Sequence, residues 1–292
     1  MSNNYFETFR GAIARVYHAN GAVVGAGFLV SDRHLLTCAH VVAAALSIPA
    51  NTQPKPTGYI ELDFPLIAPG QKVKSKVVFW QPINPSQSGE DIAGLELEDI
   101  LPIGIQPVRL VAAEDFWGHS VRIFGFPQGH DRGIWADGIL RDRTANNWVQ
   151  LDAIAAQNRP VEKGFSGAPI WDESLQGVVG MAVAAEKRRE DVTAAFMIPT
   201  SILQAAWLDL DRWMAQYPSI VRDSMDSLPP FRQVKLKALN GRYSILIEKY
   251  EAAYNQLSST LNDTDTVIIN QQIKGIELEI NKVEQEINSL SK

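Results

Sequence analysis

Three short segments place a histidine, an acidic residue and a serine where strands are expected to begin or end. His40 closes the run LLTCAH, Asp91 stands immediately before the apolar run IAGLEL, and Ser166 lies between glycines in KGFSGAP. A serine hydroxyl is a weak nucleophile near neutral pH, so it needs a base such as imidazole within hydrogen-bond reach. A carboxylate on the other ring nitrogen orients that base. These residue types predict nucleophilic catalysis by Ser166, with His40 as base and Asp91 as its partner.

The glycines around Ser166 predict a second part of the same site. Glycine lets the backbone turn sharply, so the amides of Gly164 and Ser166 can point together at a developing oxyanion. Other acidic residues near Asp91 are alternatives for the orienting carboxylate, namely Glu90, Glu96 and Asp99. Asp91 is favoured over them because it alone opens the strand.

The segments that must position these residues read as a mainly β domain. From Arg10 to about Thr200, short β-prone runs such as GAVVGAGFLVS, SVRIFGFP and LQGVVGMAV alternate with Gly, Pro, Asn and Asp. Many short strands with turn signals between them predict antiparallel barrels or a sandwich rather than βαβ units. From Ser201 to Gln216 the apolar spacing becomes helical, which predicts a closing helix packed on the β body.

The end of the chain has a different pattern. Residues 218–230 are rich in proline and mixed in polarity, which predicts a linker. In residues 231–292 apolar side chains recur at alternating spacings of three and four, the seam of a coiled coil. The first track is Leu236, Leu239, Tyr243, Leu246, Tyr250, Ala253 and Leu257, and the second is Ile273, Ile276, Ile280, Val283, Ile287 and Leu290. The polar run between them suits a turn, so we expect an antiparallel helical hairpin.

The three chemical motifs, in their order along the chain, resemble a known family. TCAH, DIAGLEL and GFSGAP are similar to the signatures of trypsin-like peptidases, and the order His, Asp, Ser is that of the chymotrypsin arrangement. GFPQGHDRGIWADGIL and AAFMIPTS further resemble its bacterial, high-temperature-requirement branch. The resemblance covers roughly the first 215 residues. It implies a peptidase domain over 1–217, built as a double six-stranded antiparallel β-barrel with His40, Asp91 and Ser166 at the barrel interface.

The resemblance also implies a substrate pocket and shows two departures. Phe165 precedes the serine where an acidic residue is common, so activation by trimming of the N-terminus is not expected. No acidic residue stands six before Ser166, which leaves a preference for Arg or Lys without support at that position. The residues expected to line the pocket are Pro160, Val161, Gly180, Met181, Ala182 and Ala195.

Composition narrows the classes of partner. The chain has 33 acidic and 27 basic residues, a formal net charge of −6, so it lacks the positive field that holds nucleic acid or an anionic membrane. No apolar stretch is long enough to span a bilayer. We therefore expect a protein substrate and neither a nucleic-acid nor a membrane partner. The histidines outside the TCAH motif have no metal-site spacing, and no cofactor is expected.

Cysteine usage and the first residues bear on the compartment. Cys38 is the only cysteine, so an internal disulfide is excluded, and we read it as a packed core side chain. The first twenty residues lack the apolar core of a signal peptide. Both features favour the cytoplasm.

The segment 231–292 resembles the small helical effector-associated modules at the ends of bacterial conflict-system proteins. The resemblance implies that this segment binds a protein partner, an adaptor or sensor, and that the peptidase is recruited or activated through it, as an effector in antiviral defence. The alternative function is a degenerate peptidase that serves as a peptide-binding or scaffold module. The complete set of His40, Asp91 and Ser166 favours the active enzyme.

Overall fold

The computed structural model describes residues 5–83, 91–153, 161–183, 187–189, 192–193, 195–216 and 263–290, with separate positions between 235 and 257. The chain divides into two compact units, Met1–Pro218 and Ser219–Lys292, and each is described by itself. The boundaries expected from the sequence, at 217 and 231, stay predictions.

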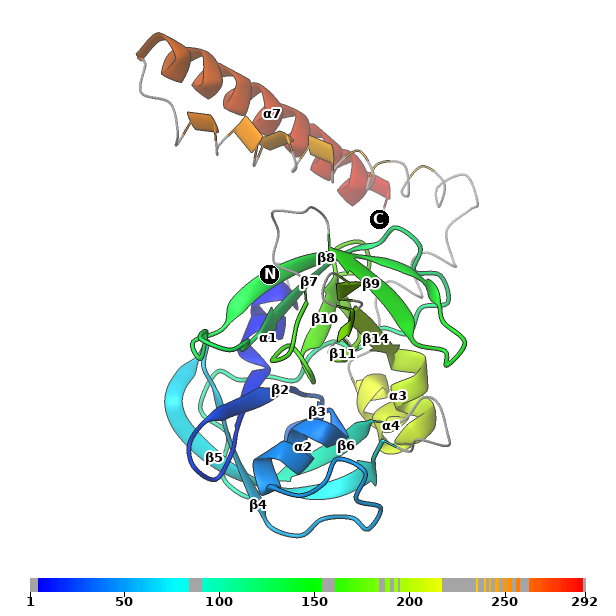
Figure 1. Ribbon diagram of the computed structural model, residues 1–292. Coiled ribbons are helices and arrows are strands. Elements are labelled where there is room, and N and C mark those ends of the chain that lie inside the picture. The colour runs from blue at the N-terminus through cyan, green and yellow to red at the C-terminus, as the bar shows by residue number, and fades with distance from the viewer. Residues whose placement is uncertain are drawn as a thin grey trace. The chain divides into compact units, whose positions relative to one another are not determined.

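The first barrel is a closed antiparallel sheet of six strands in the order β1-β2-β3-β6-β5-β4 (Figure 1). Its strands are β1 (Ile13–Tyr17), β2 (Val23–Leu29), β3 (His34–Thr37), β4 (Tyr59–Phe64), β5 (Ala68–Gln81) and β6 (Ile92–Leu97). Pairing of β1 with β4 closes the sheet. A short helix, α2 (Ala39–Leu46), follows β3 directly.

The second barrel repeats this architecture with the order β10-β11-β14-β9-β8-β7, and β10 pairs with β7 to close it. Its strands are β7 (Ser120–Gly125), β8 (Ile134–Arg143), β9 (Val149–Ala153), β10 (Pro169–Asp172), β11 (Gly177–Val183) and β14 (Ala195–Pro199). Two short strands, β12 (Lys187–Arg189) and β13 (Val192–Thr193), pair with each other outside it. Along β8, the buried residues Ala136, Gly138 and Leu140 alternate with more exposed neighbours, as a barrel wall requires. The predicted double six-stranded antiparallel barrel is confirmed.

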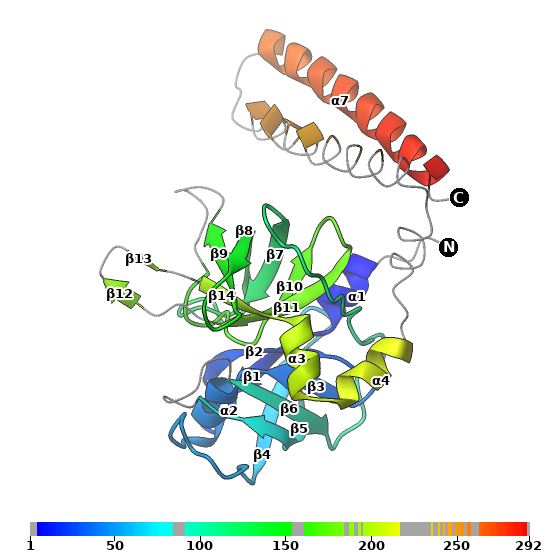
Figure 2. The same ribbon diagram turned by 90° about the vertical axis from the view of Figure 1, so that its right-hand side faces the viewer.

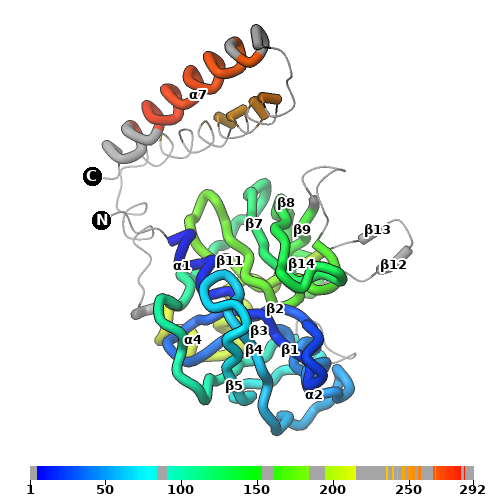
Figure 3. Tube along the Cα trace, turned by 90° about the vertical axis from the view of Figure 1, so that its left-hand side faces the viewer, coloured from blue at the N-terminus to red at the C-terminus, as the bar shows by residue number. Residues whose placement is uncertain are grey.

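The helices at the two ends of this unit each pack on the barrel that is more distant in the sequence. Helix α1 (Tyr5–Gly11) precedes the first barrel but lies against the second, as Figure 3 shows. There the ring of Phe9, which is completely buried, lies 5.2 Å from that of Trp171 on β10. The ring of Phe6 lies 5.8 Å from that of Trp135 on β8. The N-terminal segment therefore ties the two barrels together.

The segment after β14 connects the barrels in the opposite sense, because it follows the second barrel and packs on the first (Figure 2). It consists of α3 (Thr200–Ala206) and α4 (Asp209–Gln216). The buried Trp207 between them stacks on Phe79 of β5 at 5.5 Å, and Trp213 of α4 stacks on His34 of β3 at 4.4 Å. A Cβ on Gly94 of β6 would overlap the Trp207 ring, so glycine is required under it.

The single closing helix expected from Ser201 to Gln216 is therefore wrong in one respect. The chain becomes extended at Trp207 (φ −120°, ψ 93°), which divides the segment into two helices. The helical spacing of apolar residues continues through this point. Docking of the indole on the first barrel breaks the helix, and that contact has no local sequence signal.

The second unit contains α7 (Asp263–Leu290), and four residues of the expected second track, Ile273, Ile276, Ile280 and Val283, pack in its apolar clusters. Val283 clusters with Leu239 and Leu246, whereas Ile273 clusters with Ala253. Leu239 and Leu246 thus pack near the end of α7, and Ala253, later in the sequence, packs nearer its start. This arrangement is antiparallel. Most of the first predicted helix lies outside the described residues, so the complete hairpin stays a prediction. In the part of the chain that the structure describes, no helix combines the length and apolarity needed to cross a membrane.

The aromatic tie at Trp207 predicts a large stability effect. Trp207→Ala removes a side chain that is 7% exposed and leaves a cavity over Gly94 and Phe79, so we expect a loss of about 3 kcal/mol in the free energy of unfolding. Trp117→Ala, at a position that is 65% exposed, is the matched control and should cost under about 1 kcal/mol. Urea unfolding measures both; equal losses would contradict the assignment.

Candidate active site

His40 is positioned by the start of α2. Cys38, in extended conformation, is the N-cap residue and makes no side-chain capping bond, so the first amides of the helix need other acceptors. The His40 amide donates to Asp91 Oδ1 at 2.9 Å. The sequence placed His40 at the end of a strand; instead β3 ends at Thr37 and His40 lies in the first helical turn.

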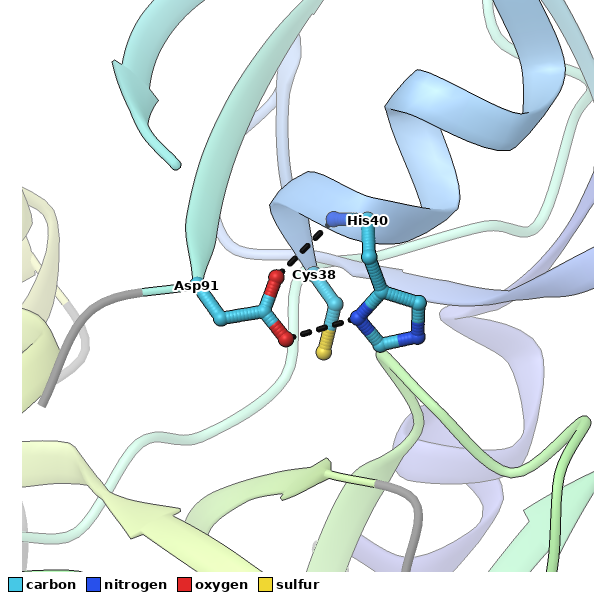
Figure 4. Close-up of side chains that lie close together, drawn as sticks. All are labelled: Cys38, His40 and Asp91. Carbon is cyan, nitrogen blue, oxygen red and sulfur yellow. Dashed lines mark hydrogen bonds and ion pairs between the residues drawn. The ribbon is translucent and has the colours of Figure 1, made fainter. Parts of the chain in front are cut away.

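Asp91 is hydrogen-bonded to both the backbone amide and the ring of His40. Its second carboxylate oxygen, Oδ2, lies 2.6 Å from His40 Nδ1 (Figure 4). Asp91 is 1% exposed, whereas the His40 side chain is 30% exposed. The carboxylate therefore orients a ring that still reaches solvent. A carboxylate beside the first turn of a helix is also favoured by the helix dipole, by roughly 0.3–1 kcal/mol.

The backbone at Asp91 is strained in a way that directs this carboxylate. Asp91 has φ 98°, outside the region that most L-residues adopt, and its amide donates to Gln81 O at 3.1 Å. The strand β6 begins at the next residue, as expected. Of the alternatives, Asp99 accepts a bond from the Lys74 amide and Glu96 pairs with Lys76, while Glu90 lies outside the described residues.

The arrangement fixes the chemistry available to the imidazole. An ionised carboxylate only accepts hydrogen bonds, so the neutral ring carries its proton on Nδ1, facing Asp91. Nε2 is then left with a lone pair on the side away from Asp91. A ring held in this tautomer can take a proton at Nε2 and return it, which is what a general base must do.

The loop of Ser166 depends on two glycines with positive φ. Gly164 has φ 110° and Gly167 has φ 82°. A Cβ on Gly164 would overlap the Phe126 carbonyl oxygen, and one on Gly167 would overlap the Ala26 carbonyl oxygen. Both the conformation and the close packing therefore require glycine on each side of the Phe165–Ser166 pair.

This loop is hydrogen-bonded to the part of the first barrel that leads to His40. Ser166 is buried, and its carbonyl oxygen accepts from the Ala26 amide of β2 at 2.9 Å. The Thr37 hydroxyl in turn donates to the Ala26 carbonyl at 2.6 Å. Ser166 of the second barrel and the segment leading to His40 thus meet at the barrel interface. The role of Thr37 was missed from the sequence, because only the fold brings it to Ala26.

The structure buries the described residues predicted for the substrate pocket. Gly180, Met181 and Ala182 lie on β11 and Ala195 begins β14. Val161, like these, is buried. Pro160 lies outside the described residues, and the pocket as a whole stays a prediction. The amides of Gly164 and Ser166 as an oxyanion site also stay a prediction.

Cys38 lies beside the His40–Asp91 pair. Donor atoms of the three side chains lie within 4.8 Å of one another, close enough to hold an ion. However, the carboxylate oxygens of Asp91 are engaged by His40, and burial, with the Asp91 charge, raises the pKa of the Cys38 thiol well above its usual value. A metal would need the thiolate, so these residues fit hydrogen bonding better than metal binding.

The raised pKa of Cys38 predicts that its thiol resists alkylation in the folded chain. Because the folded pKa lies above the unfolded one, the thiolate fraction at pH 8 is smaller in the native state than after unfolding. Iodoacetamide should modify the native protein at least about a hundredfold more slowly than the protein in urea. Rapid native labelling, followed by mass spectrometry, would refute this environment.

Comparison with protein families identifies two domains in this chain. Residues 25–181 match the model of the trypsin-like peptidase domain, a range that contains His40, Asp91 and Ser166. Residues 229–290 match effector-associated domain 9. No curated protein matches the chain.

Two solved structures are similar to this chain. A serine endoprotease from Yersinia pestis shares 21% identity at a TM-score of 0.50, over 73% of this chain and 68% of that one. An inactive serine-to-alanine mutant of Rv3671c from M. tuberculosis H37Rv shares 18% identity at a TM-score of 0.49, over 72% of this chain and 92% of that one. Since the trypsin-like model covers more than half of the residues and the two closed barrels carry it, this chain belongs to the trypsin-like peptidase family of serine hydrolases.

Proposed function

We propose that the chain is an intracellular serine endopeptidase that cleaves protein substrates through an acyl-enzyme, with His40, Asp91 and Ser166 as its triad. The observation that carries the proposal is the pair of hydrogen bonds that Asp91 accepts from the amide and Nδ1 of His40. A buried carboxylate held to histidine in this way selects the tautomer that a general base needs. The bonding of the Ser166 loop to β2 supports the nucleophile.

In the first half of the proposed reaction, the Ser166 hydroxyl attacks the carbon of the scissile peptide. Its proton passes to His40 Nε2, and the carbonyl oxygen becomes an oxyanion that the amides of Gly164 and Ser166 stabilise. Asp91 stabilises the imidazolium that results. The carbon–nitrogen bond then breaks, the leaving amine takes the proton from His40, and an ester on Ser166 remains.

Water completes the reaction by the reverse assignment of protons. His40 takes a proton from water as the oxygen attacks the ester carbon. The bond between carbon and the Ser166 oxygen breaks, and the serine regains its proton from His40. The product is a carboxylic acid, and the enzyme returns to its starting state.

The C-terminal unit supports recruitment by a protein partner. It matches effector-associated domain 9, and described apolar side chains on it remain exposed to solvent. These are Ile245, Ile268 and Leu278. We propose that a partner binds residues 231–292 and localises or activates proteolysis, as an effector of a bacterial conflict or defence system.

Active-site labelling tests the triad. A fluorophosphonate should label the wild type on Ser166, and Ser166→Ala should abolish labelling. Asp91→Asn keeps the side-chain shape but loses the charge that orients the base, so labelling should slow by about a thousandfold or more. Asp99→Asn is the matched control and should label at the wild-type rate. Unchanged labelling of Ser166→Ala, or an inert wild type of native fold, would count against the proposal and favour a degenerate peptidase.

Truncation tests the separation of catalysis from recruitment. Removing residues 231–292 should leave fluorophosphonate labelling within about threefold of the full chain, since the predicted triad lies in the first unit. The far-ultraviolet circular dichroism of the truncated chain should retain the β signal. Complete loss of labelling in a folded truncated chain would show that the C-terminal unit is part of the catalytic machinery.

A further inference from the structure

The buried Cys38 thiol lies at the interface of the two barrels and has no role in the proposed mechanism. It belongs to the first barrel, two residues before His40, and donates to the Ala182 carbonyl on β11 of the second barrel at 3.4 Å. The same carbonyl accepts the Gly167 amide at 2.9 Å, and Gly167 directly follows Ser166. One acceptor therefore joins the residues that flank the predicted base and the predicted nucleophile.

The sulfur also lies near the carboxylate side of the site. Figure 4 shows the Cys38 sulfur directed toward the space between Asp91 and His40, and its donor atom lies within 4.8 Å of theirs. Burial is the largest cause of the raised pKa of the thiol, and the charge of Asp91 is the next. A thiol that keeps its single proton is a donor, and that proton is directed to the Ala182 carbonyl.

We propose that Cys38 is a positioning residue of the active site, whose thiol holds the His40–Asp91 pair in register with the Ser166 loop through the Ala182 carbonyl. Catalysis needs its groups within fractions of an ångström of their reacting positions, and the two halves of this site come from different barrels. Fully buried and protonated, Cys38 neither attacks substrate nor binds metal. This inference rests on the proposed triad.

Three variants separate positioning from simple packing. Cys38→Ala removes the donor and leaves a small cavity, Cys38→Ser keeps a donor, and Val178→Ala makes a cavity of similar kind near the other end of β11. Val178 is also completely buried, and its backbone bonds are to Arg109 and Val111, neither of which belongs to the proposed triad or its loops. The probe is a fluorophosphonate, whose second-order rate of labelling at Ser166 is measured together with the melting temperature.

We expect Cys38→Ala to lower the labelling rate about tenfold, the effect of one net hydrogen bond. Cys38→Ser should recover the rate to within about threefold of wild type, and Val178→Ala should keep the wild-type rate despite a lower melting temperature. If Cys38→Ala labels like wild type, or Cys38→Ser is as slow as Cys38→Ala, Cys38 is a packing residue and the inference is wrong. If Cys38→Ala does not fold, the comparison of Cys38→Ser with Val178→Ala decides. A wild type that is not labelled at all would instead sink the proposed function.

Discussion

The arrangement of the site depends on the hydrogen bonds between the buried carboxylate of Asp91 and His40. Removing a carboxylate from water is costly unless hydrogen bonds replace its hydration, and here the amide and the ring of His40 both donate to it. The pair of bonds fixes the start of α2 against the start of β6. Backbone strain at Asp91, at φ 98°, is the local cost of directing the carboxylate there. A side chain that moved away would leave a helix terminus, a ring and a buried charge without partners.

A second constraint is that the two barrels must stay aligned. The Ser166 carbonyl accepts from the Ala26 amide, and the Ala182 carbonyl accepts from the Cys38 thiol, so two hydrogen bonds from first-barrel donors cross the interface. Larger apolar contacts support them, because α1 packs on the second barrel and Trp207 packs on the first. The N-terminal end of this unit thus packs on the second barrel, and its C-terminal end packs on the first. Precision in the proposed triad follows from these ties, since neither barrel contains all three residues.

The C-terminal unit is organised on a different principle. Its small apolar clusters, around Val283 and Ile273, run along one face of α7, and ion pairs such as Arg242–Glu279 flank them. Local helical packing of this kind forms without the long-range pairing that a barrel needs. The division is consistent with the proposal that the first unit carries the chemistry and the second binds a partner.

The local features of this protein could be predicted from its sequence. Alternation and turn residues predicted the β-rich domain, the position of Asp91 before a strand was correct, and the three motifs predicted the family. These properties depend on neighbours within a few residues, so they are legible in the chain. The tertiary structure was needed to show that His40 lies in the first turn of a helix, that Trp207 interrupts the closing helix, and that Thr37 and Cys38 face the Ser166 loop. Those outcomes depend on contacts between residues as far apart as 51 positions for His40 with Asp91 and 144 for Cys38 with Ala182, and barrel closure and packing alone bring such residues together.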